Sequence, residues 1–133
     1  MIDFEDNIVD YLANGLEKKY TKINVTSEFS SDEESTFPTV LVYEMDNYVY
    51  TPTLDSSLQE NDARVVYQVE VYTKAKSTSR IKAKKILNDV DSLLGAIGFV
   101  RTIKTQIDTG YTDMTRLVAR YQAIINKQGY ISN

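Results

Sequence analysis

The chain offers few side chains suited to an active site. It contains no Cys and no His, so a thiolate nucleophile, the usual general base at neutral pH and the commonest zinc ligands are missing. Two acidic groups remain as candidates for a hard cation, the run Asp32, Glu33 and Glu34 and the pair Asp89 and Asp91. The run lacks the spacing and the glycine of an EF-hand loop, and residues two apart on a helix do not face the same way. We therefore expect no catalytic residue, no metal site and no cofactor, and we predict that the protein is not an enzyme.

Charge is distributed unevenly along the chain. The net charge of −4 argues against a general nucleic-acid binder, which normally carries a basic excess. Residues 23–63 contain nine acidic residues and no Lys or Arg, whereas residues 74–85 contain six bases and no acid. The chain is therefore electrically polarised along its length.

Tyrosine is unusually frequent, with ten copies among 133 residues. Tyr48 and Tyr50 fall in the stretch 47–61, which is longer than an ordinary hairpin loop and also contains Leu54. A tyrosine has an apolar body and a polar tip and is favoured at interfaces. We predict a flexible loop at about 47–61 that contributes these three residues to a subunit interface. A ligand pocket on this loop is the alternative interpretation.

Hydrophobic periodicity predicts the elements that must position these residues. Helices are expected at 3–20 and 77–97, and strands at 23–29, 38–45, 64–73, 99–107 and 115–126. The order is α-β-β-β-α-β-β, and short connections favour antiparallel pairing. The prediction is one α+β domain over residues 1–133. It is a two-layer sandwich with a mainly antiparallel sheet of about five strands, both helices on one face and a loose tail at about 127–133.

The second predicted helix carries charges that oppose its macrodipole. Its first turns are basic, and Asp89 and Asp91 lie in later turns. A solvated charged face is one interpretation. The other is that the bases contact a phosphate backbone or an acidic surface of another subunit. The stretch 23–63, which has acids and no bases, could supply that surface. The candidate interface residues are Arg80, Lys82, Lys84 and Lys85 on the basic side and Glu44 and Asp46 on the acidic side.

Two predicted strands, 64–73 and 115–126, carry apolar residues on both faces. Val66 and Tyr72 lie opposite the first apolar stripe, and Val118 and Ile124 lie opposite the second. Two helices cover one face of a sheet, so the other face or an edge is predicted to pair with a neighbour. Scattered exposed apolar residues, which are normal on a sheet, are the alternative.

The order and spacing of several segments resemble the tail terminator (tail completion) proteins of long-tailed bacteriophages and prophages. The likeness covers nearly the whole chain, and no single segment is diagnostic. Together with the opening helix, it is carried by Phe37–Glu44, Val65–Tyr72, Ala83–Ile86 through Val90–Asp91, Leu94–Arg101 and Arg116–Tyr121.

The resemblance implies a ring, usually a hexamer, at the neck of the virion. Such a ring ends tail-tube polymerisation and offers a surface to the head-side connector protein, so the expected partners are the chain itself, the tail-tube protein and that connector. DNA passes through the channel without specific binding, and Asp32, Glu33 and Glu34 are candidates for facing it. The protein would be made in the cytoplasm of the bacterial host, and no membrane partner is expected.

Two alternatives stay open at this point. One is another head–tail connector component with the same small α+β architecture. The other is a small-molecule-binding or regulatory α+β module. The sequence also leaves open whether the tail is contractile.

Overall fold

The structure is a computed structural model that describes residues 5–20, 22–28, 38–49, 62–75, 77–107, 109–110, 113–126 and 131–132. Two helices are present, α1 (Glu5–Glu17) and α2 (Ser79–Ala96). The strands are β1 (Asn24–Thr26), β2 (Thr39–Val49), β3 (Asp62–Lys74), β4 (Val100–Ile107), β5 (Met114–Asn126) and β6 (Ile131–Ser132). Neither helix is long and apolar enough to cross a membrane, a finding that applies to the described residues alone.

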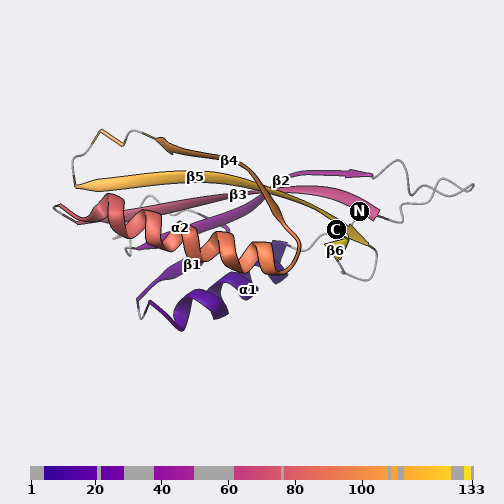
Figure 1. Ribbon diagram of the computed structural model, residues 1–133, viewed down its shortest axis with the longest axis horizontal. Coiled ribbons are helices and arrows are strands. Elements are labelled where there is room, and N and C mark those ends of the chain that lie inside the picture. The colour runs from indigo at the N-terminus through magenta and orange to yellow at the C-terminus, as the bar shows by residue number, and fades with distance from the viewer. Residues whose placement is uncertain are drawn as a thin grey trace, which may run out of the picture.

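The strands form one sheet in the order β1-β2-β3-β5-β4, and β6 adds two residues to β5. All pairs are antiparallel except β1 and β2, which run parallel with Val25 opposite Val40. Both helices lie on the same side of the sheet (Figure 1). The predicted α+β class, the two-layer arrangement and the order α-β-β-β-α-β-β are confirmed.

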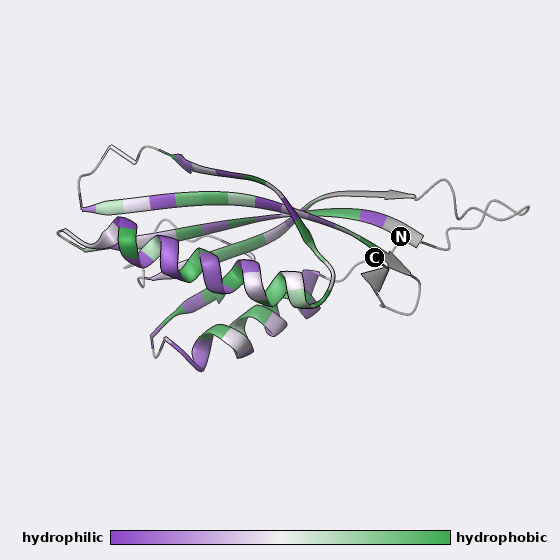
Figure 2. Ribbon diagram, viewed as in Figure 1, coloured by the Kyte–Doolittle hydropathy of each residue, from purple (hydrophilic) through white to green (hydrophobic). Residues whose placement is uncertain are grey.

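The core lies between the helices and the inner face of the sheet. The predicted apolar stripe of α1 is buried at Ile8, Leu12 and Leu16, and α2 buries most of its own stripe in the same cluster. Successive side chains of a strand point to opposite faces, and Figure 2 shows hydrophilic residues interspersed among hydrophobic ones along the strands. The inner-face residues of the two longest strands are Val65, Tyr67, Val69, Val71, Leu117, Ala119, Tyr121 and Ala123.

The two helices approach each other closely at Gly15. A Cβ atom added there would lie 2.8 Å from both terminal carbons of Leu93 on α2. The Tyr11 hydroxyl donates a hydrogen bond of 2.6 Å to the carbonyl of Leu93 at the same contact. Gly15 looks unfavourable in a helix, but its missing side chain provides the room that this contact needs.

Two β-bulges change which residues share a face. In β4 the register shifts between Arg101 and Ile103, so that Arg101 pairs with Tyr121 on the inner face and Ile103 pairs with Arg120 on the outer face. A regular strand over the predicted range 99–107 would place Arg101 and Ile103 on the same face; the bulge overturns this, because one extra residue reverses every later side chain. A second bulge lies in β2 between Glu44 and Asp46.

Two predicted irregular segments contain strand residues. β2 continues to Val49, so the first part of the predicted loop 47–61 is paired with β3, and residues 50–61 lie outside the described part of the chain. In the predicted loose tail 127–133, Ile131 pairs with Ile125 of β5. Both strand segments are held by pairing with residues distant in the sequence. Neither segment has the alternating pattern by which a strand is predicted from its own residues.

Candidate functional site

A cleft lined by five lysines is the most distinctive surface feature of the described residues. Its volume is about 520 Å³. The lysines come from four parts of the fold and are Lys19, Lys22, Lys74, Lys82 and Lys85. Tyr20, Pro38, Thr73 and Ile86 complete the lining. We call this feature the lysine cleft.

The topology brings these lysines together from distant positions in the sequence. Lys19 follows the end of α1, Lys22 precedes β1, and Lys74 ends β3. Lys82 and Lys85 are three residues apart in the first half of α2, a spacing that places two side chains on the same side of a helix. The parallel pairing of β1 with the start of β2 brings Lys22 to the same end of the sheet as the end of β3.

Asp89 ties the end of α1 to α2 beside the lysine cleft. Its carboxylate accepts a hydrogen bond of 2.5 Å from the Tyr20 hydroxyl. The same carboxylate forms an ion pair with the Lys19 ammonium group at 3.1 Å. Burial alone would raise the pKa of Asp89, but the hydrogen bonds from Tyr20 and Lys19 outweigh it and lower that pKa from its ordinary value. Asp89 is therefore ionised at neutral pH and fixes the position of Lys19.

Asp91 faces the sheet and has different partners. It accepts a hydrogen bond of 2.9 Å from the Tyr121 hydroxyl of β5 and lies 3.5 Å from the Arg101 guanidinium of β4. Asp89 and Asp91 thus point in different directions, as their spacing predicts. Their tertiary contacts also account for acids in the second half of α2, where the macrodipole alone disfavours them.

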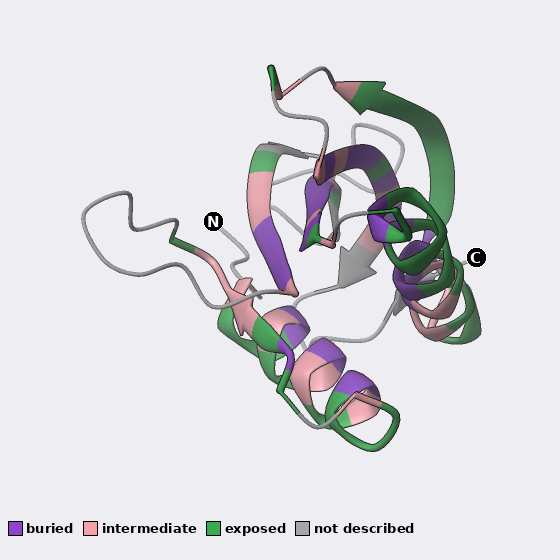
Figure 3. Ribbon diagram, turned by 90° about the vertical axis from the view of Figure 1, so that its left-hand side faces the viewer, coloured by how far each residue is buried: buried purple, intermediate pink, exposed green. Residues whose placement is uncertain are grey.

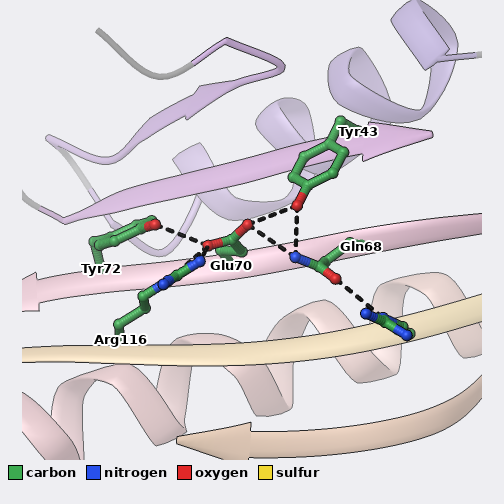
Figure 4. A network of polar contacts seen from close by, with 6 residues as sticks. Tyr43, Gln68, Glu70, Tyr72 and Arg116 are labelled. Atoms are coloured by element: carbon green, nitrogen blue, oxygen red, sulfur yellow. Dashed lines mark hydrogen bonds and ion pairs between the residues drawn. The ribbon is translucent and has the colours of Figure 1, made fainter. Parts of the chain in front are cut away.

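A polar network occupies the outer face of the sheet, which neither described helix covers (Figure 4). At its centre is Glu70, only 2% exposed. Its carboxylate accepts hydrogen bonds from the hydroxyls of Tyr43 and Tyr72, both at 2.8 Å, from Arg116 Nε at 2.7 Å and from the Gln68 amide at 2.9 Å. Tyr43, Tyr72 and Arg116 are themselves partly exposed, so they form the outer layer around the carboxylate.

The network sets the protonation of its members. Burial would raise the pKa of Glu70, but the hydrogen bonds that it accepts lower that pKa overall. Burial, followed by the hydrogen bond to Glu70, raises the pKa of Tyr72 to about 12 and raises that of Tyr43 as well. Glu70 is a charged acceptor with its donors in place, so the network stabilises the sheet and offers no open position for a ligand.

The outer edge of the sheet is formed by β4. Seven of its eight residues are exposed, and Figure 3 shows the strand in green along nearly its whole length. Val100 is 61% exposed and Ile103 is 47% exposed, and both lie on the outer face. Within the described chain, no strand pairs with the edge of β4 that faces away from β5.

The structure separates the predicted basic interface residues into two groups. Lys82 and Lys85 line the lysine cleft, whereas Arg80 and Lys84 are exposed on α2 but are not part of its lining. Lys19 and Lys22 were missed, and Lys74 was noted only as the first residue of the basic stretch 74–85. Their only signal in the sequence was their charge, because nothing local shows that a helix end, a strand start and a strand end meet.

Glu44 and Asp46, the two predicted acidic residues that the structure describes, do not lie at the cleft within one subunit. The backbone N–H of Glu44 donates a hydrogen bond of 2.9 Å to the Glu5 carboxylate at the start of α1. The Tyr67 hydroxyl donates a hydrogen bond of 3.2 Å to the Glu44 carboxylate. Lys19 lies beyond the other end of that helix, about 20 Å away at 1.5 Å per residue. Asp46 and Tyr48 are paired with Val66 and Arg64 in the sheet. The predicted residues outside the described part of the chain are Tyr50, Leu54, Asp32, Glu33 and Glu34.

Over the described residues, no three acidic side chains gather as a metal site would require. Neither a protein-family model nor a curated protein matches the chain. The features that bear on function are the lysine cleft, the exposed edge of β4 and the resemblance to tail terminator proteins.

Proposed function

We propose that the chain is a structural subunit of a ring at the neck of a tailed phage or prophage particle. In this role it ends tail-tube polymerisation and provides the surface that joins the tail to the head. The proposal begins from the resemblance to tail terminator proteins in the order and spacing of segments from Phe37 to Tyr121. The geometric observation that carries it is the exposed edge of β4, which has the properties of a surface for self-association.

An edge strand presents unpaired backbone N–H and C=O groups that another chain can pair with. Soluble proteins usually keep such strands short or strongly charged, but β4 is eight residues long and exposes Val100 and Ile103 beside its free edge. Lys104 and the bulge after Arg101 are devices that limit indiscriminate pairing. The edge therefore suits one specific partner surface better than open-ended aggregation.

The sheet also favours a head-to-tail contact. Its two edge strands differ, since β1 has three residues and β4 has eight. A contact between β4 and a different surface of the next subunit is heterologous, and heterologous contacts generate closed rings when the rotation between subunits permits. Acids of the 23–63 stretch on one subunit and the exposed bases Arg80 and Lys84 on the next would add charge complementarity to such a contact.

Self-association of the purified protein tests the proposal. Ile103→Glu is expected to raise the dissociation constant of the ring by about tenfold or more, because it places a charge in the apolar contact. Asn7→Glu is the control, since it places the same charge on an exposed position of α1 and not on β4 or α2. Mass as a function of concentration, measured by sedimentation velocity with and without the tail-tube protein of the same particle, gives the readout.

The outcomes separate the alternatives. A strict monomer under all these conditions, or equal effects of the two substitutions, contradicts the proposed ring contact. A ring that binds the head-side connector but leaves tube length unchanged in an assembly reaction points instead to another connector component.

A further inference from the structure

Three lysines of the lysine cleft, Lys22, Lys74 and Lys82, have no acidic partner among the described residues, and Lys85 interacts electrostatically with Asp89 without forming an ion pair. The ion pairs of the described chain join Lys19 to Asp89, Arg101 to Asp91 and Arg116 to Glu70. None of them includes Lys22, Lys74, Lys82 or Lys85, although all four line the same cavity as Lys19. The protein thus gathers positive charge in one concave site while its net charge is −4.

Like charges that converge in a cavity oppose folding, and an anion in the cavity relieves their repulsion. Pro38, Ile86 and Tyr20 contribute apolar surface to the lining, and low-dielectric walls focus the field of the charges around them. The cleft lies beside the first half of α2, where the macrodipole adds positive potential. Its volume of about 520 Å³ falls within the range of ligand sites.

The shape of the site distinguishes between anions. Every cationic side chain in the lining is a lysine, a compact point charge that binds phosphate oxygens as well as carboxylates. A phosphate chain concentrates several charges in a small volume, whereas an acidic protein surface supplies one charge per side chain over a wider area. Arg80 and Lys84, on the open surface of α2, are better placed for a protein surface.

We propose that the lysine cleft binds a phosphate-bearing anion through Lys22, Lys74, Lys82 and Lys85, with Lys19 held in position by Asp89. The phosphates belong either to a free polyphosphate compound or to the backbone of a nucleic acid, and the chemistry of the contact is the same. This inference does not depend on the proposed neck function, because it concerns a surface remote in the sheet from the free edge of β4.

Binding of sodium tripolyphosphate, a short DNA duplex and a hexaglutamate peptide, measured by isothermal titration calorimetry at low and moderate salt, tests the proposal. The test variant is Lys82→Gln with Lys85→Gln, and the matched control is Arg80→Gln with Lys84→Gln. Both remove two positive charges from exposed positions of the same helix. The cleft variant is expected to weaken phosphate binding by about tenfold or more and the control by less than about threefold. Higher salt should weaken binding by the wild type.

The proposal is supported if the wild type binds tripolyphosphate or the duplex and only the cleft variant loses this binding. The ligand that the wild type binds more tightly identifies the source of the phosphate. The proposal is overturned if the two variants lose phosphate affinity equally, or if hexaglutamate binds more tightly than either phosphate ligand. It is also overturned if the wild type binds no phosphate ligand at millimolar concentration in low salt, whether or not the cleft variant loses self-association. Circular dichroism of both variants checks that they are folded.

Discussion

Replacing Glu70 by Gln removes the charge at the centre of the outer-face network and leaves its volume almost unchanged. The native carboxylate is 2% exposed and accepts four hydrogen bonds, one of them from the Arg116 guanidinium. A glutamine has one acceptor oxygen, and its amide group would face donors of Gln68, Tyr43 or Arg116. The substitution therefore leaves Arg116 without its counter-charge and at least one donor without an acceptor.

The expected loss follows from these contacts. Breaking a buried ion pair by removing one partner costs about 3–5 kcal/mol, and hydrogen bonds to a charged group contribute about 1.5–3 kcal/mol each. The Arg116 side chain is 33% exposed, so water can solvate its charge after the substitution. We therefore expect the lower end of the range, about 3 kcal/mol of unfolding free energy, or about 10 °C in Tm for a domain of this size.

Urea unfolding followed by circular dichroism, at a fixed protein concentration, measures this loss. Arg64→Ala is the control, because Arg64 lies on the same strand but makes an exposed hydrogen bond to Gln122 at 2.7 Å. It should cost less than about 0.5 kcal/mol. The double variant Glu70→Gln with Arg116→Gln should be less destabilised than the two single losses added together. A loss for Glu70→Gln that matches the control, or strict additivity in the double variant, refutes the assignment of Glu70 as a paired buried charge.

Three further predictions concern pH and packing. The pKa of Glu70 is lowered in the folded state, so its contribution to the unfolding free energy is fully present above the ordinary pH range of carboxyl titration. That contribution is lost as pH falls through the lowered pKa. Glu70→Gln should therefore flatten the acid limb of a plot of unfolding free energy against pH. The pKa of Tyr72 is raised to about 12, so its contribution to the unfolding free energy is present below about pH 10 and is lost as pH rises toward 12. Tyr72→Phe should therefore flatten the alkaline limb of the same plot. An unchanged slope of that limb contradicts the prediction. Gly15→Val should cost about 1–3 kcal/mol through overlap with Leu93, and Leu93→Ala in the same chain should recover part of that cost in a denaturation series.

The elements could be predicted from the sequence because their periods are local properties of the backbone. The fourfold spacing of Ile8, Leu12 and Leu16 indicated α1, and the alternation from Val65 to Val71 indicated β3. Such patterns fix which residues face inward as long as the element is regular. At Thr102, between two paired residues of β4, the bulge ended that regularity, and the face of Ile103 could not be deduced.

The candidate site was only partly visible in the sequence. Lys82 and Lys85 were predicted as interface residues because their charge opposes the dipole of α2. Of the remaining cleft lysines, Lys74 lies 8 positions before Lys82 in the chain, whereas Lys22 and Lys19 lie 60 and 63 positions before it. Residues so distant become neighbours only through strand order, and strand order depends on the packing of the whole domain.

Composition and local pattern thus determined by themselves that this protein is a small α+β domain without thiol or imidazole chemistry and with separated charges. Only the tertiary structure decided where those charges act. It buried Glu70 under its own donors, gave Asp89 and Asp91 separate partners, and collected five lysines in one cleft. The physical reason is that a charge acts through its distance to other charges and its exposure to water, and for residues far apart in sequence both are set by the fold.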